Sequence, residues 1–223
     1  MSHKKIFDRA TIAIILCSTF PMFIVGCYFV HIPWNMKRLN LTESDLGLAI
    51  LIFGIFFLVS NQFSARYLVP RIGTKIVMSS SMILISFGTV LLVSVPNYTL
   101  FLICSIPAGL GWGSSGPIGG IHAQLIEKHS KRIVTPYYAM GFNLGILFGG
   151  LLAAYLINNN ILPWMAFLIL AFFGIFVSLI IYNFSLPKEM DFKGNGEKYK
   201  IPEKKVLIFG FLLFIIFGSG GII

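Results

Sequence analysis

The sequence predicts an all-α polytopic membrane protein, a helical bundle of six transmembrane helices plus an incomplete seventh. Three observations carry this prediction. Of the 223 residues, 57% are apolar and only 11% are charged, against about 25% charged in an ordinary soluble domain. The apolar residues gather in seven long runs, and the basic residues lie between those runs.

The composition excludes the main alternatives. One soluble core cannot hide this much apolar surface. The chain has 22 Phe, which excludes disorder, and aromatic residues do not alternate with period two as in a transmembrane β-barrel. The three cysteines, Cys17, Cys27 and Cys104, all lie inside apolar runs, so no disulfide scaffold is expected.

Each apolar run is long enough for a transmembrane helix, which needs about 20 residues, and several begin with helix-start residues. Thr42 and Asp45 provide a cap and an acid before the second run. Pro136 and Pro163 suit the first turn of the fifth and sixth runs, and Pro96 marks a short turn. The runs cover residues 10–35, 46–65, 76–95, 100–124, 136–157, 163–185 and 206–223.

The basic residues predict the orientation. Fifteen of the 17 lysines and arginines fall in the N-terminal tail and in the segments 66–75, 125–135 and 186–205, which alternate helices would place on one side. Basic loops stay in the cytoplasm, so the N-terminus is expected there. The positive charge therefore indicates topology, and no nucleic-acid partner is expected.

The charged segment 186–205 is longer than the other loops and is interpreted as a cytoplasmic central linker. It separates an N-terminal six-helix bundle, residues 1–185, from a partial seventh helix, residues 206–223. The last run stops without a polar flank. We therefore expect a missing C-terminal helical half, encoded by the same gene or supplied as a second chain.

The spans lack the residues that membrane enzymes use. No Asp, Glu, Lys or Arg lies inside them, and His31 and His122 have no carboxylate close in sequence. Paired acids, a zinc site or a nucleophile with its base would be required, so the chain is not predicted to be an enzyme. No cofactor and no metal are expected. The two histidines lie near span ends, where a hydrated imidazole needs no function.

A solute path is predicted beside the first and fourth spans. In transporters built from three-helix repeats, helices interrupted by Gly or Pro at corresponding positions mark the binding site. Spans one and four are both interrupted in this way, although close helix packing through small residues explains the pattern equally well. The cavity candidates are Pro21, Tyr28, Trp112, Ser114 and Asn143.

The fifth span carries Gly141, Gly145 and Gly149 at four-residue spacing. Residues spaced by four lie on one face of a helix, so these glycines form a smooth surface on which a neighbouring helix packs. Asn143 lies between them, and both cavity lining and helix packing remain open for it.

The segment 66–75, RYLVPRIGTK, resembles the signature of the major facilitator superfamily, Gly-x-x-x-Asp-Arg-x-Gly-Arg-[Arg/Lys], at the same loop. Arg71, Gly73 and Lys75 match it, whereas Arg66, Pro70 and Thr74 stand where the signature has Gly, Asp and Arg. The resemblance implies that the loop takes part in conformational change. It also extends to the six-helix half, the central linker and the glycine-rich span four.

This resemblance implies a transmembrane secondary transporter that moves a small solute by alternating access, in the plasma membrane or cell inner membrane. Its partners would be a small-molecule solute, neutral or weakly polar, and the lipid bilayer. Two alternatives remain from the sequence: a seven-helix membrane receptor or sensor, and a dimerising half-size transporter. The first requires an outside N-terminus and a complete last helix.

Overall fold

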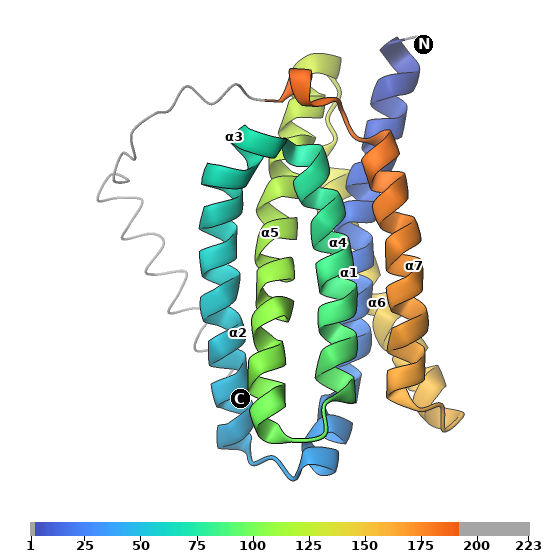
Figure 1. Ribbon diagram of the computed structural model, residues 1–223. Helices are drawn as coiled ribbons and strands as arrows, with labels where there is room; N and C mark the ends of the chain where they lie inside the picture. Colours follow the sequence, from blue (N-terminus) through green and yellow to red (C-terminus); the bar gives the residue numbers. More distant parts are fainter. Residues whose placement is uncertain (1–2, 192–223) are drawn as a thin grey trace, which may run out of the picture. The chain divides into compact units, whose positions relative to one another are not determined.

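The computed structural model describes residues 3–191, and six long helices run alternately up and down within them (Figure 1). Each coincides with one of the first six apolar runs, so the all-α bundle is confirmed; the run 206–223 lies outside the described residues. The long helices are α1 (His3–Leu39), α2 (Glu43–Phe63), α4 (Thr74–Ser94), α5 (Tyr98–Ser130), α6 (Thr135–Asn158) and α7 (Pro163–Phe184).

Five of these helices are long and apolar enough to cross a membrane: Ile6–Leu39, Glu43–Ile72, Thr74–Ser94, Thr135–Asn158 and Pro163–Phe184. Because a membrane interior leaves backbone groups no water to bind, helices satisfy them internally. The sixth long helix, α5, is richer in glycine and serine and lies between α2 and α4 (Figure 1).

The predicted helix-start residues have the expected roles. Thr42 and Asp45 form a capping box, in which the Asp45 amide donates to the Thr42 hydroxyl at 3.2 Å and the Thr42 amide donates to the Asp45 carboxylate at 2.9 Å. Asn97, which the sequence analysis did not single out as a cap, accepts from the Leu100 amide at 2.9 Å and caps α5. Pro136 and Pro163 lie in the first turns of α6 and α7.

The segment 66–75 is not the open loop that the sequence predicted. Helix α2 continues into a π-helical turn, Ser64–Leu68, and then into the short helix α3, Val69–Ile72. A π turn accommodates an extra residue without ending the helix. Gly73 is the single residue between α3 and α4, and its φ of +90° lies in a region that favours glycine.

The expected interruptions of the first and fourth spans are also corrected. Helix α1 runs unbroken through Pro21 and Pro33, and α5 runs unbroken through Pro107 and Pro117. Packing against neighbouring helices allows a transmembrane helix to keep its course at a proline. These prolines therefore do not create discontinuous helices.

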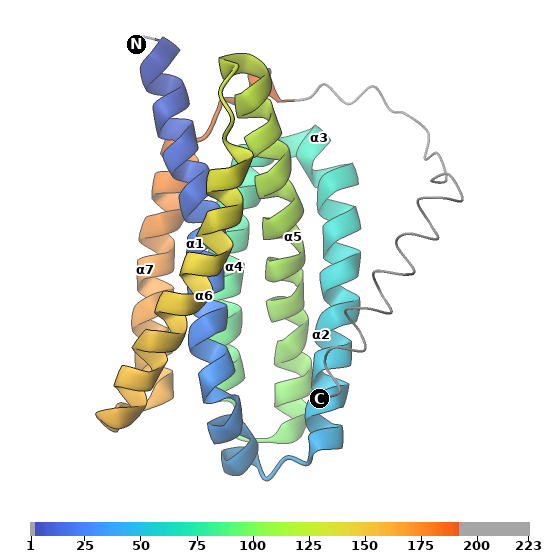
Figure 2. The same ribbon diagram turned by 180° about the vertical axis from the view of Figure 1, so that it is seen from behind.

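Several helix pairs pack through glycine, and α6–α1 and α5–α2 are two of them. A Cβ atom on Gly145 of α6 would lie 2.7 Å from the Met22 Cβ of α1 and 2.9 Å from the Phe23 amide nitrogen. On α5, a Cβ atom on Gly113 would lie 2.8 Å from the carbonyl carbon of Phe57 on α2. The smooth glycine face of span five is thus confirmed, and its partner is α1 (Figure 2).

The helix pairs repeat in the order expected for two three-helix units. The first unit is α1, α2 and α4, and the second is α5, α6 and α7. The first helix of each unit packs on the second helix of the other unit, α1 on α6 and α5 on α2. The third helix of each unit packs on the first helix of the other unit, α4 on α5 and α7 on α1. Helices α4 and α7 lie against each other (Figure 1). Helices α1 and α5 therefore occupy equivalent places in the bundle, although neither is discontinuous.

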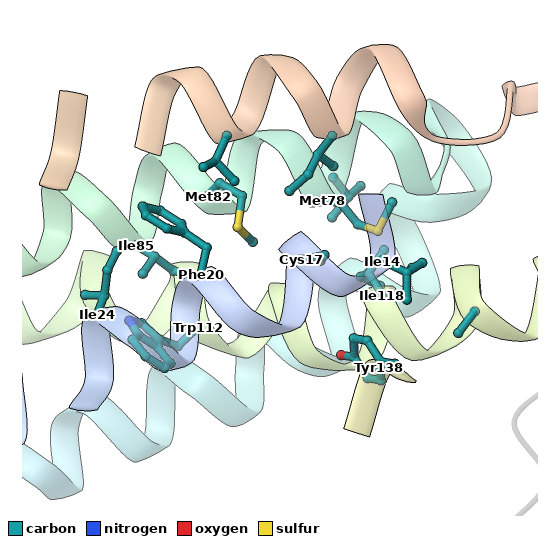
Figure 3. Close-up of a cluster of buried hydrophobic side chains, with 14 of the residues drawn as sticks. Ile14, Cys17, Phe20, Ile24, Met78, Met82, Ile85, Trp112, Ile118 and Tyr138 are labelled. Carbon is teal, nitrogen blue, oxygen red and sulfur yellow. The ribbon is translucent and has the colours of Figure 1, made fainter. Parts of the chain in front are cut away.

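The core lies where α1, α4 and α5 meet. Ile14, Ile24, Met82 and Ile85 are fully buried there, and Trp112 of α5 lies beside Ile24 and Ile85 (Figure 3). Dispersion contacts in such a dry, close-packed region hold membrane helices together.

The segment between α5 and α6 is held by Glu127, which lies beyond the apolar run that ends at residue 124. Its carboxylate accepts from the amides of Thr135 and Val134, each at 2.7 Å, and so caps α6. These two donors, Thr135 first, hold the pKa of the Glu127 carboxyl below its usual range.

A carboxyl whose pKa is lowered by folding stabilises the folded state above its unfolded pKa, about 4.3, and loses this effect as the pH falls through the folded value. We expect Glu127→Gln to lower the melting temperature of the purified protein at pH 7. The substitution should also shrink the difference between melting at pH 7 and at pH 3. The exposed Glu43 provides the control, and an equal effect of Glu43→Gln would contradict this role.

Candidate solute-binding site

A cavity of about 280 Å³ lies in the half of the bundle remote from the N-terminus, between α1, α2, α4 and α5. Every side chain that lines it is uncharged. The hydroxyls of Thr89 and Ser105 donate to carbonyls of their own helices, at 2.8 and 2.9 Å. The wall is therefore apolar, and aromatic rings supply much of it, from Tyr28, Phe29, Phe53, Phe101 and Trp112.

Two of the five predicted cavity residues, Tyr28 and Trp112, border this cavity. Tyr28 is half-buried on α1 and meets the Phe167 ring of α7 edge-on, with ring centroids 6.3 Å apart. Trp112 is only 8% exposed. Each side chain has an apolar ring and one polar group, so each combines an apolar surface with a hydrogen-bonding group.

The other three candidates lie elsewhere in the described bundle. Pro21 is buried inside α1 and borders neither this cavity nor the second one. Ser114 borders the second cavity, of about 270 Å³, and its hydroxyl donates to the Leu110 and Gly111 carbonyls at 3.0 Å each. Asn143 is exposed on α6. Packing between helices of this bundle therefore does not explain why a polar amide side chain occurs at this position.

The sequence did not single out the apolar residues that line the first cavity. Ala49, Phe53 and Ala108 are examples. Because every transmembrane helix is apolar on most of its surface, such residues carry no signal that separates a cavity wall from a lipid-facing wall.

Both span histidines are buried, which corrects their interpretation as hydrated residues near an interface. His31 and His122 are each 0% exposed. The Nδ1 atom of His31 lies 2.8 Å from the Cys27 carbonyl oxygen, to which it donates. His122 uses both ring nitrogens, toward Thr74 at 2.7 Å and the Leu186 amide at 3.1 Å.

The residues of the loop motif take separate positions around one turn. Arg71 lies in α3, Gly73 forms the turn, and Lys75 lies in the first turn of α4, where its ammonium is 4.0 Å from the centre of the Tyr182 ring. A carboxylate reaches this turn from Asp191, which follows α7. Among residues 3–191, no group of three or more His, Cys, Asp or Glu is placed to hold a metal ion.

Up-and-down apolar helices whose contacts repeat as two three-helix units, with an uncharged cavity among α1, α2, α4 and α5, are the architecture of an integral membrane protein of the carrier class. The chain belongs to the Major Facilitator Superfamily, whose family model matches residues 14–223. The family membership that the sequence resemblance indicated is thereby confirmed.

Similar curated proteins include the quinolone resistance protein NorA of Staphylococcus aureus strains Mu50, N315 and MW2. Each is 24% identical to this chain over 149 residues. The matched region covers 66% of this chain and 37% of each relative, so the chain matches well under half of the relatives' length.

Proposed function

We propose that this chain is the N-terminal half of a secondary transporter that moves a small, uncharged or weakly polar aromatic solute across the plasma membrane. The observation that carries the proposal is the apolar, aromatic cavity between α1 and α5 in a chain of this family. In carriers built from such repeats, two bundles rock about a central site and expose it to each side in turn. Tyr28 and Trp112 are proposed to contact the solute.

The relatives suggest the solute class to test first. They are named for resistance to quinolones, which contain a flat aromatic ring system, and a wall of aromatic rings favours such ring systems over sugars. We propose export of compounds of this type from the cytoplasm.

A second helical bundle, encoded with this chain or supplied as a second chain, is proposed to complete the cavity. The match to only 37% of the relatives' length supports this proposal. Asn143 and the other exposed residues of α6 are then available to face the second bundle.

Transport is tested by counterflow of a radiolabelled quinolone in liposomes that contain the chain together with that second bundle. Saturable counterflow that unlabelled quinolone competes supports the proposal, and its absence across a panel of aromatic solutes contradicts it. Residues 1–223 alone are expected to give none. Saturable counterflow by this chain alone would instead favour the dimerising half-size transporter.

The proposed orientation places the N-terminus, the α5–α6 segment and the α3–α4 turn in the cytoplasm. These parts lie at one end of the bundle, and the segments around residues 40–42, 95–97 and 159–162 lie at the other (Figure 1). Because fifteen of the 17 basic residues belong to this first set together with the segment 186–205 that follows α7 in the sequence, we expect that end to face inward.

Cysteine labelling of intact cells tests this orientation in a variant with the native cysteines removed. A membrane-impermeant maleimide should label Asn159→Cys and spare Ser130→Cys until the cells are permeabilised. Strong labelling at position 130 in intact cells would reverse the proposed topology.

A further inference from the structure

The segment that follows α7 returns to the α3–α4 turn and caps α4. Helix α4 has no cap from its own neighbouring residue, because Gly73 has no side chain. Instead the Thr74 amide donates to one carboxylate oxygen of Asp191 at 2.9 Å, and the Thr74 hydroxyl donates to the other at 2.6 Å. Asp191 thus satisfies a free amide at a helix N-terminus, where a negative charge is stabilising.

His122 of α5 closes this contact into a ring of hydrogen bonds. The Thr74 hydroxyl already gives its proton to Asp191, so the His122 Nδ1 atom, 2.7 Å away, must donate to that oxygen. The Nε2 atom accepts from the Leu186 amide at 3.1 Å. The donor directions therefore fix one neutral tautomer of His122, and the chain from Leu186 to Asp191 completes the ring.

The turn is shaped to admit the Asp191 carboxylate. Gly73 has φ +90°, and a Cβ atom at that position would lie 2.8 Å from an Asp191 carboxylate oxygen. The Lys188 ammonium donates to the Arg71 carbonyl at the end of α3. The segment 186–191 therefore satisfies backbone groups on both sides of the turn.

We propose that Asp191 is a positioning residue for the turn that carries Arg71, Gly73 and Lys75. Asp191 supplies a carboxylate to a turn that has Pro70 where the family signature has Asp. Together with Thr74 and His122, it holds the start of the central linker against the bundle, and we call this contact the lock. A role of the lock in setting the rate of solute transport rests on the proposed function, whereas the hydrogen-bonded contact itself is independent of that function.

The lock is measured by the reactivity of a buried thiol. Ser185 is 8% exposed and directly precedes Leu186, so Ser185→Cys is a nearly isosteric reporter in a variant whose three native cysteines are replaced by alanine. Labelling with N-ethylmaleimide in detergent requires the segment to open. We expect Asp191→Asn and Thr74→Val each to raise the labelling rate about tenfold, because each removes a hydrogen bond to a charged group.

The matched control is Glu189→Gln, which removes an equal charge from an exposed carboxylate two residues away. It should leave the rate unchanged. Because Asp191 and Thr74 share the hydroxyl–carboxylate contact, the rate increase in the double variant should be smaller than the product of the two single increases. Equal rates for Asp191→Asn and the parent, or fully additive effects of the two changes, would overturn the lock.

The role in transport is measured separately, with the chain and its second bundle in liposomes. We expect Asp191→Asn to lower the maximal rate about tenfold and to leave the solute concentration at half-maximal rate unchanged, since Asp191 acts through the turn. Faster thiol labelling with unaltered transport would overturn that role and leave the lock standing. If the parent protein transports no solute, the proposed function fails, and the labelling result still decides the lock.

Discussion

Replacing Gly149 by alanine is expected to destabilise the bundle, whereas the same change at the adjacent Gly150 should not. A Cβ atom at position 149 would lie 2.8 Å from the Phe23 carbonyl carbon and 3.0 Å from the Cys27 amide nitrogen of α1. Both neighbours are backbone atoms, so no rotamer change relieves the overlap and α1 must move away from α6. Overpacking of this kind costs about 1–3 kcal/mol.

Gly150 provides a matched control on the same helix. No atom lies within 4 Å of a Cβ placed there, and alanine favours a helix over glycine by about 1 kcal/mol. In a protein of this size, a loss of 1–3 kcal/mol lowers the melting temperature by about 2–12 °C.

Melting followed by fluorescence-detected size exclusion measures both variants in the same detergent. Gly149→Ala should melt earlier than the parent, and Gly150→Ala should melt at the same temperature or later. Equal losses in the two variants would show that helix contact through Gly149 does not hold α1 and α6 together.

Trp112→Ala is expected to lower transport about tenfold per folded molecule, because the substitution removes an aromatic wall of the cavity. Loss of an aromatic contact and of the area it buries corresponds to a change of this size. The protein should also lose about 3–5 kcal/mol of stability, since Trp112 is 8% exposed and packs in the core. Transport must therefore be normalised to folded protein.

Phe20→Ala separates the two effects. Phe20 is 5% exposed and belongs to the same core (Figure 3). It does not border the cavity. It should destabilise the protein to a similar degree and leave quinolone counterflow per folded molecule near the parent value. If both variants lose transport equally, Trp112 contributes to packing and does not contact the solute.

The sequence determined the number and the approximate position of the six long helices among the described residues, but not the π turn and the short helix α3 that join α2 to α4. Backbone groups in lipid must be satisfied within the helix, so each span needs a continuous apolar run that is visible in the sequence. Hydrogen bonds between residues close in sequence fix some helix ends, as Thr42 and Asp45 do at the start of α2, so such ends are also visible in the sequence. The four-residue spacing of Gly141, Gly145 and Gly149 also predicted a helix-packing face.

The sequence predicted the site less completely. Tyr28 and Trp112 border the cavity, whereas Pro21 and Asn143 border neither of the two cavities and Ser114 borders the second. Proline and glycine were interpreted as helix interruptions, but their effect depends on the neighbouring helices. Helices α1 and α5 continue through their prolines because packing supports them on both sides.

Only the tertiary structure decided which helices pair, where the cavities lie and which polar groups meet. In a soluble protein the apolar face of a helix marks its buried side, but in lipid both faces are apolar, so the pattern does not identify the partner. The three glycines of α6 therefore predicted a contact without naming α1. The meeting of Thr74, His122 and Asp191 joins residues separated by 48 and 117 positions, and folding of four helices is what brings them within hydrogen-bond distance.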